Sequence, residues 1–290
     1  MKQSVKKYIR WMMFVVVMLG ALYTFPRLTH ADESTNSKAQ TQKAPDAAAS
    51  TQPLRVPDGV TKDKFYLYLL VGQSNMAGRG KITPEDLETN PRVYALGVDG
   101  QWVLGKAPLH HDIKTRGVGP GLTFGKAMAK AHPDVTIGLI PAAVGGTIIE
   151  WWLPGAQRGL FDNAISQAKR AMTTGTLKGI IWQQGESDST VARAPLYHDR
   201  LMTLLHAFRH ELGDENLPIV IGGLGDFLKS SKAPVVNAAL EQVAGEINNA
   251  AFAPASKKGN IGDRLHFNTE AAHENGERMA EKMLSLEKTK

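Results

Sequence analysis

Residues 65–78 of the chain read Phe-Tyr-Leu-Tyr-Leu-Leu-Val-Gly-Gln-Ser-Asn-Met-Ala-Gly, and this stretch decides the fold. Its first seven residues are apolar or aromatic, which predicts a short strand buried in a sheet. Gly72 then lets the chain turn sharply and lets backbone come close to a ligand. Ser74 therefore stands just past the end of a buried strand, where it is a candidate nucleophile. A serine in this place also suits a helix N-cap, and this motif alone does not choose between the two.

Three further apolar runs repeat this pattern, and helical patterns lie between them. The expected strands are residues 65–71, 135–140, 177–182 and 217–224. The expected helices are residues 122–131, 161–172, 195–212, 235–248 and 269–286. Apolar strands that alternate with helices indicate a mostly parallel sheet that is covered on both faces. The predicted fold is therefore an α/β three-layer α/β/α sandwich of flavodoxin-like type, in which active sites lie at the carboxyl ends of the strands.

The amino-terminal part of the chain resembles an export signal followed by a linker. Residues 1–31 combine a basic start with the apolar run 11–23 and a small residue at the cleavage point, which is typical of a signal peptide. The alternative is an uncleaved membrane anchor, although the apolar run is shorter than the ~20 residues that a spanning helix needs. Residues 32–63 are poor in large apolar side chains, which predicts a flexible linker. The folded domain is expected at 64–290.

The charge balance excludes one class of partner. The whole chain has a net charge of +6, but residues 1–31 hold five basic residues and no acidic one, which leaves 29 basic and 28 acidic residues beyond them. A near-neutral domain has no electrostatic footprint for nucleic acid. The chain has no cysteine, so disulfides, thiol catalysis and cysteine metal sites are excluded. Nothing in the sequence requires a cofactor.

Two polar motifs follow other expected strands. Gly145 and Gly146 come after the second strand, where they either form a simple turn or present a bare backbone N–H to a developing oxyanion. Gln184, Glu186 and Asp188 come after the third strand. A buried amide is costly unless it is hydrogen-bonded. Gln184 is therefore either a side-chain donor to the same oxyanion or part of a structural network.

A fourth motif near the carboxyl terminus pairs Asp263 with His266. An aspartate three residues before a histidine can accept a hydrogen bond from its Nδ1–H, which fixes the tautomer and steadies the imidazolium. Histidine is well suited to general-base work near neutral pH. Such pairs also occur as ordinary surface hydrogen bonds, so this motif indicates a catalytic pair only in combination with the other motifs.

Together the motifs resemble carbohydrate esterase family six and the sialic-acid-specific acetylesterase-like domains, which are SGNH hydrolases. The resemblance is carried by residues 72–76, 145–151, 182–188 and 263–267, with support from 109–113 and 118–121. It covers nearly all of the expected domain. The resemblance implies that Ser74 is the nucleophile, His266 the general base and Asp263 its orienting acid.

The resemblance also implies three oxyanion donors. They are the backbone N–H of Ser74, a backbone N–H at Gly145 or Gly146, and the side chain of Gln184. Gly145 fits the family pattern better, but the sequence leaves the choice between the two glycines open. The remaining motif residues, expected to hold the site in place or to contact substrate, are Gln73, Asn75, Glu186 and Asp188.

The expected function is that of an exported serine esterase that removes O-acetyl groups from carbohydrate through an acetyl-serine intermediate. Acetylxylan and O-acetylated sialic acid both remain open as substrates, and so does the oligomeric state. Membrane contact is expected only if the signal segment is retained. One alternative is a metal-dependent hydrolase that uses His110, His111 and Asp112, although adjacent residues rarely point at one metal. A second is a carbohydrate-binding surface protein, which would have no need of the Ser, His and Asp set. A third is a lipase or thioesterase with the same triad, against which only the family resemblance speaks.

Overall fold

The computed structural model of the protein describes residues 53–111 and 116–288. The expected signal peptide at 1–31, the first part of the linker and Asp112 lie outside the described residues. Among the helices of the described part, none is both long enough and apolar enough to cross a bilayer.

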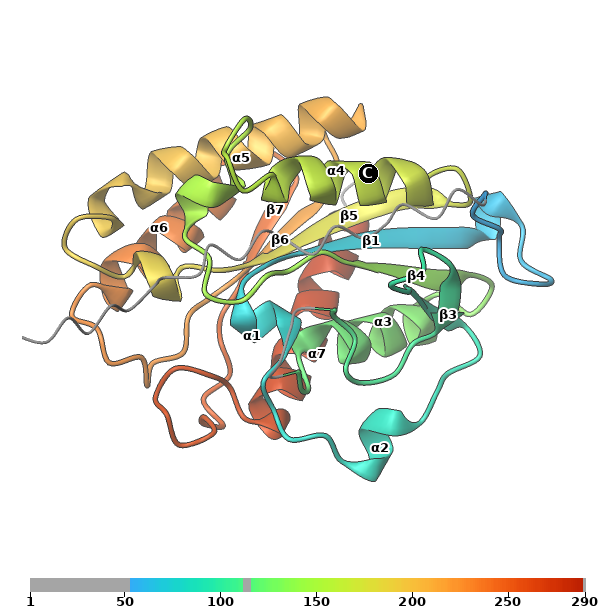
Figure 1. Ribbon diagram of the computed structural model, residues 1–290, viewed down its shortest axis with the longest axis horizontal. Helices are drawn as coiled ribbons and strands as arrows, with labels where there is room; N and C mark the ends of the chain where they lie inside the picture. Colours follow the sequence, from blue (N-terminus) through green and yellow to red (C-terminus); the bar gives the residue numbers. More distant parts are fainter. Residues whose placement is uncertain (1–52, 112–115, 289–290) are drawn as a thin grey trace, which may run out of the picture. The chain divides into compact units, whose positions relative to one another are not determined.

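Within the described residues, seven strands form one sheet in the order β3-β2-β4-β1-β5-β6-β7 (Figure 1). The strands are β1 (Phe65–Gly72), β2 (Val93–Leu96), β3 (Trp102–Leu104), β4 (Thr136–Pro141), β5 (Thr176–Gln183), β6 (Ile219–Gly222) and β7 (Ala250–Ala253). Every adjacent pair is parallel except β2 and β3, which are antiparallel. The four expected strands correspond to β1, β4, β5 and β6, and the predicted α/β fold with a mostly parallel central sheet is confirmed.

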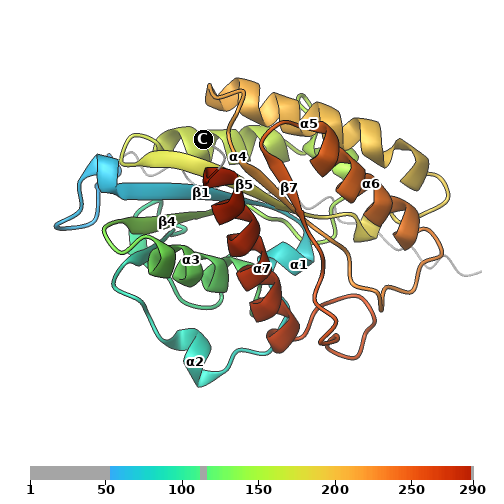
Figure 2. The same cartoon turned by 180° about the vertical axis from the view of Figure 1, so that it is seen from behind.

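Helices cover both faces of this sheet. The α-helices of the described part are α1 (Ser74–Ala77), α2 (Pro84–Leu87), α3 (Pro120–Ala131), α4 (Leu160–Ala171), α5 (Tyr197–Leu212), α6 (Ala233–Glu246) and α7 (Thr269–Glu287). Short 3-10 turns lie at Lys62–Lys64, Ile149–Trp152, Glu186–Asp188 and Ala194–Leu196. The helices α4, α5 and α6 lie on one face, and α3 and α7 lie on the other (Figures 1 and 2). All five expected helices are present, so the three-layer arrangement is confirmed.

The side chains of β1 alternate between two buried layers. Leu67 and Leu69 belong to the hydrophobic cluster on the side of α4, α5 and α6. Tyr68 and Leu70 belong to the cluster that includes α3 and α7. All four side chains are fully buried, and burial of each stabilises the fold by roughly 1.5–3 kcal/mol. Because both faces of β1 are covered, its sequence is almost continuously apolar.

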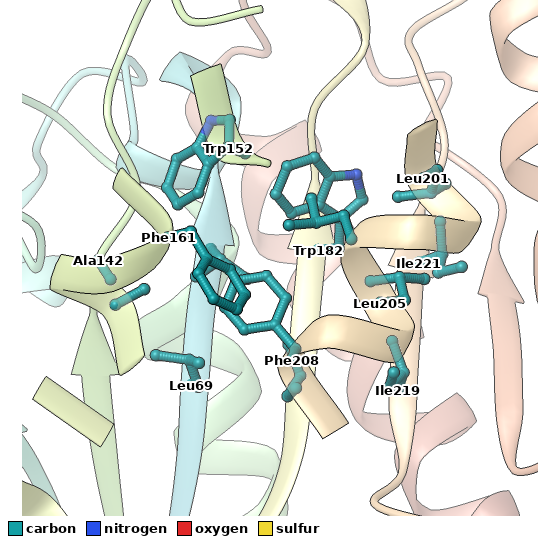
Figure 3. Close-up of a cluster of buried hydrophobic side chains, with 14 of the residues drawn as sticks. Leu69, Ala142, Trp152, Phe161, Trp182, Leu201, Leu205, Phe208, Ile219 and Ile221 are labelled. Atoms are coloured by element: carbon teal, nitrogen blue, oxygen red, sulfur yellow. The ribbon is translucent and has the colours of Figure 1, made fainter. Parts of the chain in front are cut away.

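Four aromatic side chains pack among aliphatic ones in the first of these layers (Figure 3). Trp152 and Trp182 pack edge to face, with their ring centroids 5.5 Å apart. Phe161 of α4 and Phe208 of α5 pack beneath them with centroids 4.9 Å apart. This packing ties the segment after β4 and the end of β5 to the same helices, which fixes the two segments relative to each other.

The structure differs from expectation at two sheet edges and at the start of the fold. The sequence did not indicate β2, β3 and β7, because they have only three or four residues and β7 consists mainly of alanine. In addition, Leu54, Val56 and Val60 are half-buried against the core. The packed part of the chain therefore begins about ten residues before Lys64, inside the segment expected to be a linker.

Helix α7 is held near its middle and at its end. In its first half, Gly276 lies against α3 so closely that an added Cβ would clash with the Pro120 carbonyl oxygen and lie 2.8 Å from Thr123 Cβ. At its end, the Glu287 carboxylate accepts a hydrogen bond of 3.1 Å from the Tyr68 hydroxyl and lies 2.8 Å from His132 Nε2. The helix thus spans the sheet with a fixed position.

We expect Gly276→Ala to destabilise the protein by about 1–3 kcal/mol, because the new methyl group has to push α7 away from α3. Inside a helix, replacing glycine by alanine usually has the opposite effect and raises the free energy of unfolding by up to about 1 kcal/mol. Gly245→Ala in α6 is the matched control, since an added Cβ there meets nothing within 4 Å. Urea unfolding of both variants measures the two signs, and equal stabilisation by both would contradict the close packing.

Candidate active site

The four polar motifs meet at one edge of the sheet. Ser74 begins α1 directly after β1, and the Gly145–Gly146 turn follows β4. Gln184 follows β5, and His266 lies in the loop between β7 and α7. Parallel strands bring their carboxyl ends to one edge, which explains why motifs far apart in sequence converge.

A chain of hydrogen bonds joins Ser74, His266 and Asp263. The Ser74 Oγ and His266 Nε2 atoms are 3.0 Å apart, and His266 Nδ1 lies 2.6 Å from Asp263 Oδ2. The other carboxylate oxygen of Asp263 accepts the backbone N–H groups of Leu265 and His266, both at 2.9 Å. Burial opposes ionisation of Asp263, but these hydrogen bonds prevail and hold its pKa below the usual value. A carboxylate therefore faces Nδ1, and Nε2 is left to exchange a proton with Ser74.

Glycines set the position of Ser74. At Gly72 the backbone has φ +134° and passes so close to β5 that an added Cβ would lie 2.7 Å from the Gln183 carbonyl carbon. Beyond Ser74, Gly78 has φ +97° and ends α1. Gly119 faces the Met76 carbonyl oxygen, which would lie 2.6 Å from an added Cβ. Side chains at these positions would displace α1, so the glycines are required by close packing around the candidate nucleophile.

The turn after β4 is the second part of the site. Gly146 is exposed and has φ +70°, a conformation that favours glycine. Thr147 is fully buried, its hydroxyl donates to the Val144 carbonyl at 2.9 Å, and it accepts the Trp152 indole N–H at 3.0 Å. The turn that carries both Gly145 and Gly146 is thereby anchored in the core, and either glycine remains a candidate oxyanion donor.

The side chain of Gln184 is held by three hydrogen bonds. Its side chain is fully buried, and Nε2 donates to the Thr147 carbonyl at 3.0 Å and to Asp188 Oδ2 at 2.6 Å. Its Oε1 accepts the Tyr197 hydroxyl at 3.0 Å. Both amide hydrogens are engaged in this arrangement, so donation to an oxyanion would require one of these hydrogen bonds to break. Gln184 here holds the glycine turn, and its expected role as a direct oxyanion donor stays a prediction.

Asp188 completes this hydrogen-bond network. It is fully buried, and the Oδ2 atom that accepts from Gln184 also accepts the Ile149 backbone N–H at 2.9 Å. Burial raises the pKa of the Asp188 carboxyl, while the hydrogen bonds from Gln184 and Ile149 oppose that rise. Sequence reasoning missed Thr147 and Tyr197 as members of this network. Thr147 directly follows the Gly145–Gly146 pair in the sequence, whereas no sequence pattern indicates Tyr197.

Gln73, Asn75 and Glu186 connect the third motif to the segment around Ser74. Gln73 Oε1 accepts the Ser187 backbone N–H at 3.3 Å. The Asn75 amide group donates to Glu186 Oε1 and to the Leu265 carbonyl, the latter at 3.1 Å. Burial raises the pKa of the Glu186 carboxyl, against the lowering effect of the Asn75 hydrogen bond. These residues thus lie around the candidate triad and contact its neighbours.

The two adjacent histidines have separate environments. His110 is 1% exposed, and its Nδ1 accepts the Ala143 backbone N–H at 3.3 Å. Burial, helped by the nearby charges of His111 and Arg79, lowers the pKa of His110 to about 3. The Nε2 atom of His111 lies 3.0 Å from the Leu96 carbonyl oxygen. The two rings therefore bond different backbone groups, and among the described residues no cluster of three His, Asp or Glu side chains suits a metal ion.

Comparisons with known proteins agree on one family. A family model described as carbohydrate esterase, sialic acid-specific acetylesterase matches residues 64–285. A probable carbohydrate esterase of Arabidopsis thaliana is 30% identical over 243 residues, which cover 76% of this chain and 90% of that protein. The X-ray structure of that same Arabidopsis thaliana protein superimposes with a TM-score of 0.70 at 30% identity, and the match covers 77% of this chain and 98% of the chain in that structure.

Two more distant structures share the fold. A carbohydrate acetylesterase from Xanthomonas citri has a TM-score of 0.63 at 20% identity, over 78% of this chain and 57% of that one. The structure of NanS has a TM-score of 0.64 at 17% identity, over 80% of this chain and all of that one. Both likenesses concern the fold alone.

We expect Gln184→Ala to lower stability and turnover together. Stability should fall by about 1–3 kcal/mol for each buried partner left without its hydrogen bond, because Asp188 and the Thr147 carbonyl both lose a donor. Turnover should fall because the glycine turn loses its brace. Unfolding free energy and kcat are measured on the same preparation, with exposed Gln242→Ala as the control. Lost turnover at full stability would instead favour Gln184 as a direct donor.

His110 gives the fold a defined acid sensitivity. In the unfolded chain the ring takes up a proton below its ordinary pKa of 6.5, whereas the folded ring stays neutral down to about 3. The unfolded state therefore binds more protons between these values, and stability falls as the pH is lowered through this window. From pH 7 to pH 5 the loss due to His110 is about 2 kcal/mol.

We expect His110→Gln to remove this part of the pH dependence. Urea unfolding at pH 7 and pH 5 compares the loss of stability in the wild type, in His110→Gln and in His206→Gln, whose side chain is exposed on α5. The control should lose as much stability as the wild type. An equal loss in His110→Gln would show that the buried ring is not the titrating group.

Proposed function

Because the chain belongs to the sialic acid-specific acetylesterase family of carbohydrate esterases, we propose that it is an exported serine esterase that removes acetyl groups from carbohydrate. Membership of the family supports hydrolysis of carboxylic esters. The observation that carries the serine mechanism is the hydrogen-bonded chain from Ser74 Oγ through His266 to Asp263, with distances of 3.0 Å and 2.6 Å.

The first half of the reaction forms an acetyl-enzyme. His266 Nε2 takes the Ser74 proton while Ser74 Oγ attacks the carbonyl carbon of the acetyl ester. The ionised Asp263 stabilises the resulting imidazolium through Nδ1. His266 then gives the proton to the sugar oxygen as the bond between that oxygen and the carbonyl carbon breaks. The deacetylated sugar departs with its hydroxyl group restored.

The second half repeats these roles with water. His266 takes a proton from a water molecule, whose oxygen attacks the acetyl carbonyl carbon. The proton passes to Ser74 Oγ as the ester bond to the enzyme breaks, and acetate is released. The same histidine thus acts as base and acid in both halves, which requires that its Nε2 reaches both Ser74 and the departing oxygen.

Backbone donors are proposed to stabilise the oxyanion of each tetrahedral intermediate. Ser74 begins α1, so its N–H lies where a helix has no internal acceptor. The second donor is an N–H of the Gly145–Gly146 turn, which Thr147 and Gln184 hold in place. Loss of one such donor costs about 10²–10³ in turnover in other hydrolases.

The substrate class and the location are part of the same proposal. Acetylated carbohydrate is favoured by the family, and acetylxylan and O-acetylated sialic acid are the two substrates to compare. Export is favoured by the basic and apolar pattern of residues 1–31. No observation favours a non-catalytic binding protein over an enzyme, since the Ser74, His266 and Asp263 side chains are aligned for proton transfer.

The proposal is tested by acetate release from an aryl acetate, acetylxylan and O-acetylated sialic acid. We expect Ser74→Ala to lower turnover by at least about 10³, because it removes the nucleophile. His266→Ala should lose nearly as much and Asp263→Asn somewhat less. Ser166→Ala, at an exposed position of α4, is the matched control and should keep full activity.

Three other outcomes would contradict the proposed function. Full activity in Ser74→Ala would refute the serine mechanism. Activity that a chelator abolishes would favour a metal-dependent hydrolase. Binding of the polysaccharides without acetate release would favour a carbohydrate-binding protein.

A further inference from the structure

The side chain of Asn75, the residue after the candidate nucleophile, forms hydrogen bonds with the backbone on both sides of His266. The Asn75 amide donates a hydrogen bond to the Leu265 carbonyl at 3.1 Å, and its Oδ1 accepts the Phe267 backbone N–H at 3.0 Å. Asn75 thus uses one donor and one acceptor to bind the residues before and after His266. This resembles the way in which a neighbouring strand pairs with a residue in a sheet, although here a single side chain supplies both groups.

Glu186 accepts a hydrogen bond from the remaining N–H of the Asn75 amide. Its Oε1 accepts the second N–H of Asn75, and the other carboxylate oxygen has no partner in the described part of the chain. Both residues are buried, with Asn75 4% and Glu186 8% exposed. Because all of its polar atoms are engaged, the Asn75 amide has only one orientation that satisfies its neighbours.

The loop that carries His266 also has hydrogen bonds within itself, such as that from the Ile261 N–H to the His266 carbonyl at 3.0 Å. It lies between β7 and α7, its polypeptide turns through Arg264 at φ +55°, and Asp263 is itself exposed. Phe267 anchors one side of the loop by packing edge to face on Phe227, with ring centroids 5.1 Å apart. Besides the hydrogen bond between His266 and Ser74, Asn75 joins the backbone of this loop to the start of α1.

We infer that Asn75, held by Glu186, is a positioning residue that fixes His266 relative to Ser74 for proton transfer. Neither residue is assigned a contact with the reacting atoms. Glu186 acts as a hydrogen-bond acceptor and not as a general acid or base. The inference deepens the proposed serine esterase mechanism and rests on it.

Asn75→Ala tests the inference, with Asn275→Ala as a matched control. Asn275 is 2% exposed and its Oδ1 also accepts a backbone N–H, that of Ser256 at 2.7 Å, so its removal leaves one buried backbone N–H without its acceptor, as the removal of Asn75 does at Phe267. We expect kcat for an aryl acetate to fall by about 10² in Asn75→Ala, as a misplacement of about 1 Å at the reacting groups produces. KM should change by less than about threefold, because substrate binding is not altered.

The variants of Glu186 separate positioning from chemistry. Glu186→Gln keeps an oxygen that can accept from Asn75, so it should retain at least about a third of the wild-type kcat. Glu186→Ala removes that acceptor and should lower kcat by about tenfold or more. If Glu186 transferred a proton, the glutamine variant would be as inactive as the alanine variant, and the inference would fail.

Hydrogen exchange supplies a readout that does not depend on activity. Loss of the Asn75 acceptor should speed exchange of the peptide covering residues 260–268, which contains the Phe267 N–H, while exchange in Asn275→Ala stays at the wild-type rate there. An Asn75→Ala enzyme with kcat within about threefold of the wild type, or with unchanged exchange in this peptide, would overturn the inference. If the wild type releases no acetate, the proposed function fails, and the exchange result alone decides whether Asn75 holds the loop.

Discussion

The hydrogen bond between Ser74 Oγ and His266 Nε2 joins two groups that are 192 residues apart in sequence. A contact of this kind exists only if every element between them keeps its place, because a shift of 1 Å would end it. The sheet fixes one partner by carrying Ser74 on the end of its central strand β1. Helix α7 fixes the other, since it starts three residues after His266 and packs through Gly276 against α3. The fold of the described chain thus sets the 3.0 Å distance between these two side chains.

The surroundings of this pair contain buried acids in place of the apolar packing found elsewhere. Glu186 and Asp188 are both withdrawn from water, which is costly for a carboxylate. Each one meets an amide, Asn75 in the first case and Gln184 in the second. The two amides then bind backbone, one at the loop that carries His266 and the other at the turn after β4. Hydrogen bonds offset the cost of burying these carboxylates. The Asn75–Glu186 and Gln184–Asp188 pairs thus connect the His266 loop and the turn after β4 to the end of β5.

Much of this arrangement could be predicted from the sequence. The apolar runs of β1 and β5 and the polar residues directly after them indicated which side chains would meet, because strand ends share one edge in a parallel sheet. Ser74, Asp263 and His266 do come together there. The short strands β2, β3 and β7 could not be predicted, since three or four residues of mixed character give no periodic signal. The hydrogen-bond partners of Gln184 could not be predicted for another reason. Its hydrogen bond to the Thr147 carbonyl joins residues 37 apart in the sequence, and sequence spacing does not reveal the orientation of a buried amide.

The attachment of α7 has a practical consequence. One end of this helix borders the loop of the candidate base, and its last turn is held on the far side of the molecule through Glu287, Tyr68 and His132. A rigid rod of 19 residues transmits a tilt at one end to the other. A tag or fusion partner that displaces Glu287 from these partners would therefore remove a restraint on α7, the helix that follows the loop of the candidate base.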